Sequence, residues 1–153
     1  MKYHFETLNI TRNNIINAIE GLSLEDLNTV PKGFNNNVIW NVGHVVATQQ
    51  LLCYKFSGLK MSLDSDFITK YMKGSAADND ISQEEVDYIL KQLKVLPAKL
   101  ENDYTNGVFE NYNTYTTSYN ITLSAISEAI QFNNVHEGLH FGYIMALKKL
   151  IKK

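Results

Sequence analysis

Two histidines, His136 and His140, lie four residues apart with Glu137 between them. The stretch HEGLH matches the H-E-x-x-H motif of zinc metalloproteases, in which the two histidines bind zinc and the glutamate acts as a base. Proteases of that type take their third metal ligand from a later segment. After His140 the chain contains only FGYIMALKKLIKK, which has no histidine, aspartate or glutamate. The usual protease architecture therefore cannot be completed.

Two further histidines, His4 and His44, precede this motif. His4 falls at the start of the first predicted helix, where we expect it to be solvated. His44 falls within IWNVGHVVAT, on an apolar stripe of the second predicted helix. Together with His136 and His140 it would supply three nitrogen ligands inside a helical bundle. Such a set leaves one coordination position open, as in reactive metal sites. The alternative is that the imidazoles form ordinary hydrogen bonds in the core.

The last predicted helix carries both clustered histidines on the face that the bundle must bury. Unpaired polar groups are unfavourable there, and neutral imidazole is a common ligand of zinc, nickel and iron. The pair therefore predicts a site for a divalent metal, and binding should weaken as the pH falls through the histidine range, near about 6.5. The residues of this face recur at spacings of three and four: Ile126, Ile130, Asn133, His136, His140, Ile144, Leu147 and Ile151.

Four more residues are candidates for the surroundings of this site. Asn133 precedes His136 by one turn and could support a ligand or lie at the mouth. Tyr143 could line the entrance, and Trp40 lies one turn before His44. Glu137 lies about 100° around the helix from His136. We favour a solvent-facing or supporting position for it over the role of general base.

The helical periodicity predicts an all-α fold in one domain spanning residues 1–153. We expect a four-helix bundle with antiparallel packing, and with short extra helices or turns in the connections. A stretch from Met61 to Asp80 predicts a short helix and loop, and VFENYNTYTTSY predicts either an ordered loop or a small β-hairpin. The long helices are expected from about Tyr3 to Glu20, from Asn36 or Asn37 to Gly58, from Ser82 to about Tyr104 with a bend at Pro97, and from Leu123 to Leu150 after a Thr122 cap.

Composition excludes several classes of protein. The net charge of -2 argues against nucleic-acid binding, which usually needs a basic face. Cys53 is the only cysteine, so we expect no internal disulfide. We expect its thiol to pack as a small hydrophobe without a catalytic role. The N-terminal MKYHFETLNI lacks the apolar core of a signal peptide, and no stretch approaches a membrane span. A cytoplasmic protein with neither nucleic-acid nor membrane partners is expected.

Around His44, His136 and His140 the sequence resembles the DinB-like (DinB/YfiT) four-helix bundles. FNNNVIWNVGHVVATQQ is similar to the second helix of that family, with tryptophan four residues before the metal histidine. HEGLHFGYI is similar to its last helix, H-x-x-x-H-x-G-x-I. The resemblance implies that His44, His136 and His140 are metal ligands. One departure is Tyr143, where many relatives carry glutamine after the glycine.

The resemblance also implies two functional classes. Some DinB-like bundles are metal-dependent transferases or isomerases that use a low-molecular-weight thiol, which a divalent metal activates against an electrophile. The alternative is a non-catalytic metal-binding protein of stress responses, and a third alternative is a bundle that needs no metal. The expected partners are a small-molecule thiol or electrophile, and a second copy of the chain in a homodimer.

Overall fold

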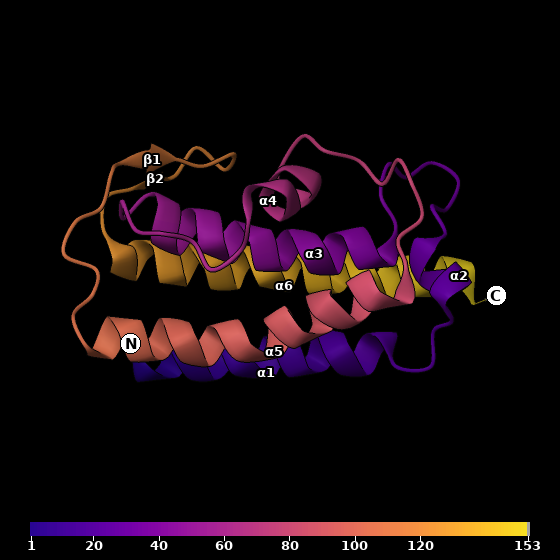
Figure 1. Cartoon of the computed structure of the whole chain (residues 1–153), viewed down its shortest axis with the longest axis horizontal. Coiled ribbons are helices and arrows are strands. Elements are labelled where there is room, and N and C mark those ends of the chain that lie inside the picture. The colour runs from indigo at the N-terminus through magenta and orange to yellow at the C-terminus, as the bar shows by residue number, and fades with distance from the viewer. Residues whose placement is uncertain (153) are drawn as a thin grey trace.

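Four long helices dominate the computed structural model of the protein, which describes residues 1–152 (Figure 1). The all-α prediction is confirmed, and the only described strands form a small antiparallel hairpin. No helix among the described residues combines the length and the apolarity that crossing a bilayer requires. The elements are α1 (Lys2–Ile19), α2 (Leu24–Asn28), α3 (Val38–Gln49), its π-helical continuation η1 (Gln50–Lys55), α4 (Ser65–Tyr71), α5 (Gln83–Thr105), β1 (Tyr115–Thr116), β2 (Thr122–Leu123) and α6 (Ile126–Ile151).

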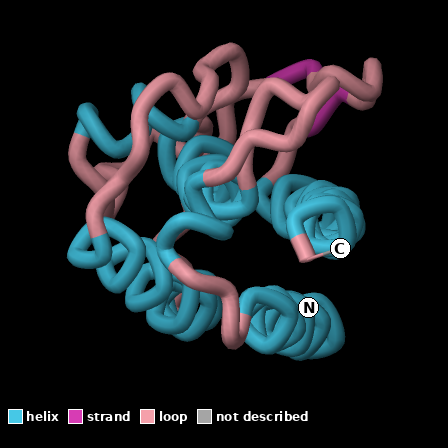
Figure 2. The backbone as a smooth tube through the Cα atoms, turned by 90° about the vertical axis from the view of Figure 1, so that its right-hand side faces the viewer, coloured by secondary structure: helices cyan, strands magenta, loops and turns pink. Residues whose placement is uncertain are grey.

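The long helices α1, α3, α5 and α6 occupy the four corners of the bundle (Figure 2). Neighbouring pairs are α1 with α6, α3 with α6, α1 with α5, and α3 with α5. The chain runs in the same direction along α1 and α6, and in the opposite direction along α3 and α5 (Figure 1). The prediction of antiparallel packing throughout is therefore wrong for two neighbouring pairs. The physical reason is the long connection that contains α4, because it returns the chain to the end of the bundle where α3 begins.

The helix that carries two of the histidines begins later than predicted. Thr122 and Leu123 do not open α6; they form β2, which pairs with β1. The helix starts at Ile126, after Ser124, whose backbone N–H and hydroxyl bind the Glu128 carboxylate at 2.7 and 3.0 Å. Pairing with Tyr115 and Thr116 therefore takes up the two residues that were expected to cap and begin the helix.

The short helix α4 packs directly against the backbone of α3. A β-carbon at Gly43 would lie 2.5 Å from a ring carbon of Tyr71, so only glycine permits this approach. The Tyr71 hydroxyl donates to Glu85 at the start of α5 at 2.6 Å. Ser82 caps α5 as predicted, by accepting the N–H of Glu85. This packing fixes the position of the last residue of α4, which contacts His44.

An arginine of α1 compensates for the proline within α5. The helix continues through Pro97 and changes direction near its middle (Figure 1). Because proline has no N–H, the carbonyl four residues earlier, that of Leu93, loses its helical donor. The Arg12 guanidinium donates to this carbonyl at 3.3 Å. The side chain of Arg12 is 1% exposed, so its other hydrogen atoms also need partners.

Those partners form a buried polar network at the centre of the bundle. Arg12 makes an ion pair with Glu137 at 2.8 Å and also donates to the Gln49 side-chain oxygen at 3.2 Å. Asn133 donates its side-chain N–H to Glu137 at 2.8 Å. The Gln49 amide in turn donates to the Leu96 carbonyl at 3.3 Å. The network therefore joins α1, α3, α5 and α6.

Replacing Arg12 alone should strongly destabilise the fold. Arg12→Met leaves the Glu137 carboxylate buried without its cation, and we expect a loss of about 3–5 kcal/mol in the free energy of unfolding. The double variant Arg12→Met/Glu137→Leu should lose less than Arg12→Met, because no charge is then left unpaired. Urea unfolding followed by circular dichroism measures both.

The exposed pair Lys99–Asp103 provides the matched control. Lys99→Met should cost no more than about 1 kcal/mol, because water screens a surface pair. A loss of under about 1 kcal/mol in Arg12→Met, or a double variant less stable than the single one, would contradict the role assigned to the buried pair.

Candidate metal centre

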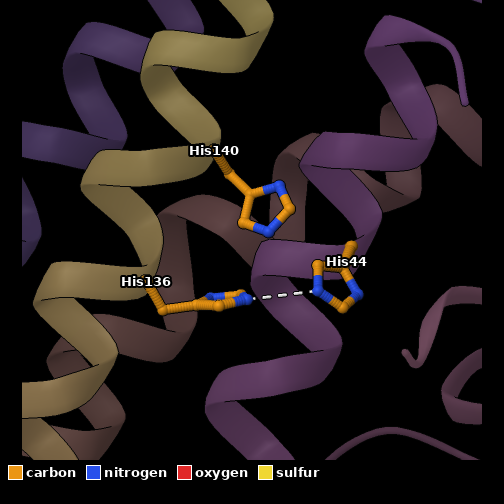
Figure 3. Close-up of side chains that lie close together, drawn as sticks. All are labelled: His44, His136 and His140. Atoms are coloured by element: carbon orange, nitrogen blue, oxygen red, sulfur yellow. Dashed lines mark hydrogen bonds between the residues drawn. The ribbon is translucent and has the colours of Figure 1, made fainter. Parts of the chain in front are cut away.

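Three histidines from two helices come together on one side of the bundle. His44 extends from α3, and His136 and His140 extend from α6 (Figure 3). Nε2 of His44 lies 3.1 Å from Nε2 of His136, and one potential ligand nitrogen from each of the three rings lies within 4.8 Å of the others. Two imidazoles bound to one zinc ion at about 2.0–2.1 Å place their nitrogens about 2.9–3.4 Å apart. The first two rings already have this spacing, and the His140 nitrogen lies within 4.8 Å of both.

A hydrogen bond at Nδ1 of His44 determines which ring nitrogen is free to bind a metal ion. Its Nδ1 lies 2.6 Å from the Tyr71 carbonyl oxygen. A carbonyl only accepts, so Nδ1 carries the proton and Nε2 keeps its lone pair. Trp40 stacks on the ring at a centroid distance of 4.7 Å and an interplanar angle of 10°, and its indole N–H donates to Ser75 at 3.1 Å. Trp40 therefore supports His44, as a residue next to the site.

Asn41 performs the corresponding role for His140. Nδ1 of His140 lies 2.9 Å from the Asn41 side-chain oxygen. The Asn41 amide donates to the Asn37 carbonyl at 2.8 Å, which leaves its oxygen as the acceptor. His140 is thus protonated at Nδ1 and has a free lone pair at Nε2. Asn41 was not predicted; the available signal was a buried amide in an otherwise apolar helix, three residues before His44.

His136 has a different environment. Its Nε2 faces His44, while its Nδ1 is buried and has no hydrogen-bond partner among residues 1–152. Since Nδ1 of His44 holds a proton, Nε2 of His136 must donate in the 3.1 Å contact between the two rings. Binding a cation here would require this shared proton to leave the space between the rings.

The surroundings keep all three imidazoles neutral at neutral pH. Burial, with His140 and His44 nearby, lowers the pKa of His136 to about 2. Burial and the neighbouring His44 lower the pKa of His140 to about 4. Burial also lowers the pKa of His44, although the Tyr71 carbonyl acts in the opposite direction. Neutral imidazole is the form that binds metal ions.

A cavity of about 380 Å³ opens beside the three rings. This volume lies within the range of small-molecule sites. Thr48 contributes a hydroxyl 3.4 Å from Nε2 of His44. The remaining walls come from η1, the segment after α4, the hairpin and α6: Leu51, Leu52, Lys55, Phe56, Met72, Lys73, Tyr115, Thr117, Ser118, Tyr119, Phe132 and Leu139. Periodicity along the chain offers no signal for the hairpin residues, because they approach the site only through the tertiary fold.

Tyr143 lies on another side of His140. Its ring is 49% exposed and contacts Phe34 edge-on at 5.8 Å. It lines a separate cavity of about 300 Å³ that also includes His140 and Trp40. Tyr143 is therefore close to the histidines without lining the larger cavity.

Two predicted neighbours of the site lie elsewhere. Asn133 and Glu137 are fully buried in the network around Arg12, and neither lines the cavity beside the histidines. The solvent-facing position for Glu137 and the mouth position for Asn133 are therefore wrong. The cause is the buried cation of α1, which holds both side chains toward the bundle centre. Cys53 is also fully buried, and burial raises the pKa of its thiol, in agreement with a packing role.

A comparison with known families identifies the family of the chain. No curated protein matches the chain at a significant level. A family model described as the DinB superfamily matches residues 7–144. The matched region runs from α1 into α6 and includes His44, His136 and His140, together with both members of the buried ion pair. Because the match covers most of the sequence, the chain belongs to the DinB superfamily.

Proposed function

We propose that this chain binds a divalent metal ion through His44, His136 and His140 and uses it to activate a small-molecule thiol against an electrophile. The observation that carries the proposal is the convergence of three neutral imidazoles, one buried and two half-buried, beside a cavity. Three protein ligands leave a coordination position for a substrate, which is typical of catalytic sites.

The residues present fit a metal ion. Tyr71 and Asn41 accept hydrogen bonds from Nδ1 of His44 and Nδ1 of His140. The lone pairs of both rings are therefore at Nε2, where a metal ion can bind them. Such supporting hydrogen bonds are typical of metal-binding histidines. An all-nitrogen donor set suits zinc, nickel or iron. In His136 the buried Nδ1, which has no partner among the described residues, would hold the ring proton once Nε2 binds the ion.

The metal would supply a single chemical property: an open-site divalent ion lowers the pKa of a bound thiol, so that the sulfur is nucleophilic at neutral pH. The chain supplies the rest. Apolar and aromatic walls exclude water from the acceptor, which strengthens electrostatic interactions there. The Thr48 hydroxyl can hydrogen bond to a substrate next to His44. A cytoplasmic location is part of the proposal, because low-molecular-weight thiols are kept reduced there.

The cavity favours a reaction over passive metal binding. A non-catalytic metal-binding protein of stress responses would need the same three histidines but no space for a second molecule. The volume of about 380 Å³ beside the rings provides that space. The two functions are separated by whether a thiol reacts faster in the presence of the loaded protein.

Metal binding should depend on the three clustered histidines and not on the fourth. Protein incubated with Zn²⁺ and then desalted should retain one equivalent, measured by plasma mass spectrometry. His44→Ala, His136→Ala and His140→Ala should each lose most of it, because two imidazoles bind zinc far more weakly than three. Circular dichroism should show that the variants remain helical.

His4→Ala is the matched control, since His4 lies at the start of α1 outside the cluster. It should retain the full equivalent. Wild-type protein that takes up no zinc, or cluster variants that bind as much as His4→Ala does, would contradict the ligand assignment.

Thiol transfer should require both the metal and the cluster. Zinc-, nickel- or iron-loaded protein should accelerate the conjugation of monochlorobimane with at least one thiol among cysteine, glutathione and coenzyme A. The acceleration should vanish in His44→Ala and persist in Cys53→Ala, because the only protein thiol is buried. Full metal occupancy without acceleration by any thiol would support the non-catalytic function instead.

The protein should retain its metal at pH values below the ordinary pKa of histidine. Folding lowers the pKa of His140 from 6.5 to about 4, so protons compete with the metal only at lower pH than in an exposed histidine. We expect zinc occupancy to be unchanged at pH 6 and to fall as the pH approaches about 4. Release is therefore expected at a lower pH than the ordinary pKa of histidine would give. Equilibrium dialysis against buffered zinc measures this. Half-release at pH 6 or above would contradict the effect assigned to burial.

A further inference from the structure

Two exposed lysines and no acidic residue line the cavity beside the histidines. Lys55 ends η1, and Lys73 follows α4 by two residues. No aspartate or glutamate is among the residues that line the cavity. Neither lysine takes part in an ion pair or side-chain hydrogen bond within residues 1–152, whereas Lys70, Lys99 and Lys152 each pair with a carboxylate. The two ammonium groups therefore give the cavity a net positive charge.

The rest of the cavity wall is largely apolar and aromatic. Phe56 and Tyr115 stack at a centroid distance of 4.2 Å, and Tyr119 meets Phe132 edge-on at 5.6 Å. These pairs connect η1 to β1 and the hairpin turn to α6. A flat hydrophobic group is well matched to such walls, because aromatic rings prefer stacked and edge-on contacts.

The cationic and metal-binding ends are separated along one helix. Lys55 follows His44 by eleven residues along α3 and η1, which corresponds to roughly 15 Å along a helix axis. The lysine side chain can cover part of this distance. A ligand that reaches from the histidines toward Lys55 must therefore be elongated, with its charge at the end distant from the rings.

We infer that the cavity selects a small organic anion with an apolar, aromatic body and a terminal carboxylate. Lys55 binds the carboxylate, Lys73 adds positive charge to the cavity wall, the aromatic walls hold the body, and the opposite end faces the three histidines. The orientation toward a metal rests on the proposed function, whereas the charge selection rests only on the lysines and the cavity.

The test compares an acid with its uncharged counterpart. Phenylbutyrate and phenylbutyramide have the same aromatic body and differ in the charge at the end of the chain. Isothermal titration calorimetry on metal-free protein at low salt should give about three- to tenfold tighter binding for the acid, the size expected for two partly solvated charge pairs. Added salt should reduce this ratio, because it screens exposed charges.

The double variant Lys55→Gln/Lys73→Gln should lose the preference for the acid while binding the amide as wild type does. Lys91→Gln, on the exposed surface of α5, is the matched control and should retain the preference. Equal binding of the two probes to wild type would overturn the inference, and so would the absence of binding by either probe at millimolar concentration.

The metal-loaded protein separates this inference from the proposed function. A preference for the acid that appears only with metal and survives Lys55→Gln/Lys73→Gln would mean that the ion binds the carboxylate, which overturns the role of the lysines. A lysine-dependent preference in a protein that binds no zinc would sustain the anion selection and reject the metal centre. The two proposals therefore fail on different measurements.

Discussion

The buried ion pair between Arg12 and Glu137 sets the rotation of α6 and so determines where the histidines point. Glu137 is held toward α1 by a 2.8 Å contact. In an α-helix the preceding residue lies about 100° around the axis. The helices α1 and α3 are the two neighbours of α6 in a four-cornered bundle (Figure 2). Fixing Glu137 toward one neighbour therefore turns His136 toward the other. The glutamate of HEGLH acts as an anchor for the helix, and its resemblance to a protease base is coincidental.

Contacts from α3 and α4 orient the rings of His44 and His140 by binding their Nδ1 atoms. Gly43 allows α4 to approach α3, and this brings the Tyr71 carbonyl to His44. Asn41 on the same helix orients His140. Burial of all three rings disfavours their protonation. Neutral imidazoles, fixed tautomers and an adjacent cavity thus result from the same packing of α3, α4 and α6.

The sequence alone predicts the parts of this structure that depend on residues close together along the chain. Periodicity and the Asn37 cap located α3, and the spacing of His136 and His140 placed both on one face of α6. The rest depends on contacts distant in sequence. Arg12 and Glu137 are 125 positions apart, and nothing near either residue indicates the other. The parallel course of α3 and α5, the approach of Tyr71 to His44 and the hairpin wall of the cavity likewise arise from tertiary packing, which spacing along the chain does not encode.

X-ray absorption spectroscopy of zinc-loaded protein measures whether three imidazoles bind one metal ion. We expect three nitrogen scatterers at about 2.0–2.1 Å with the multiple-scattering pattern of imidazole rings, plus one water oxygen in the remaining position. A coordination shell of oxygen atoms with one imidazole or none would contradict it, since such a shell describes an ion held elsewhere on the surface.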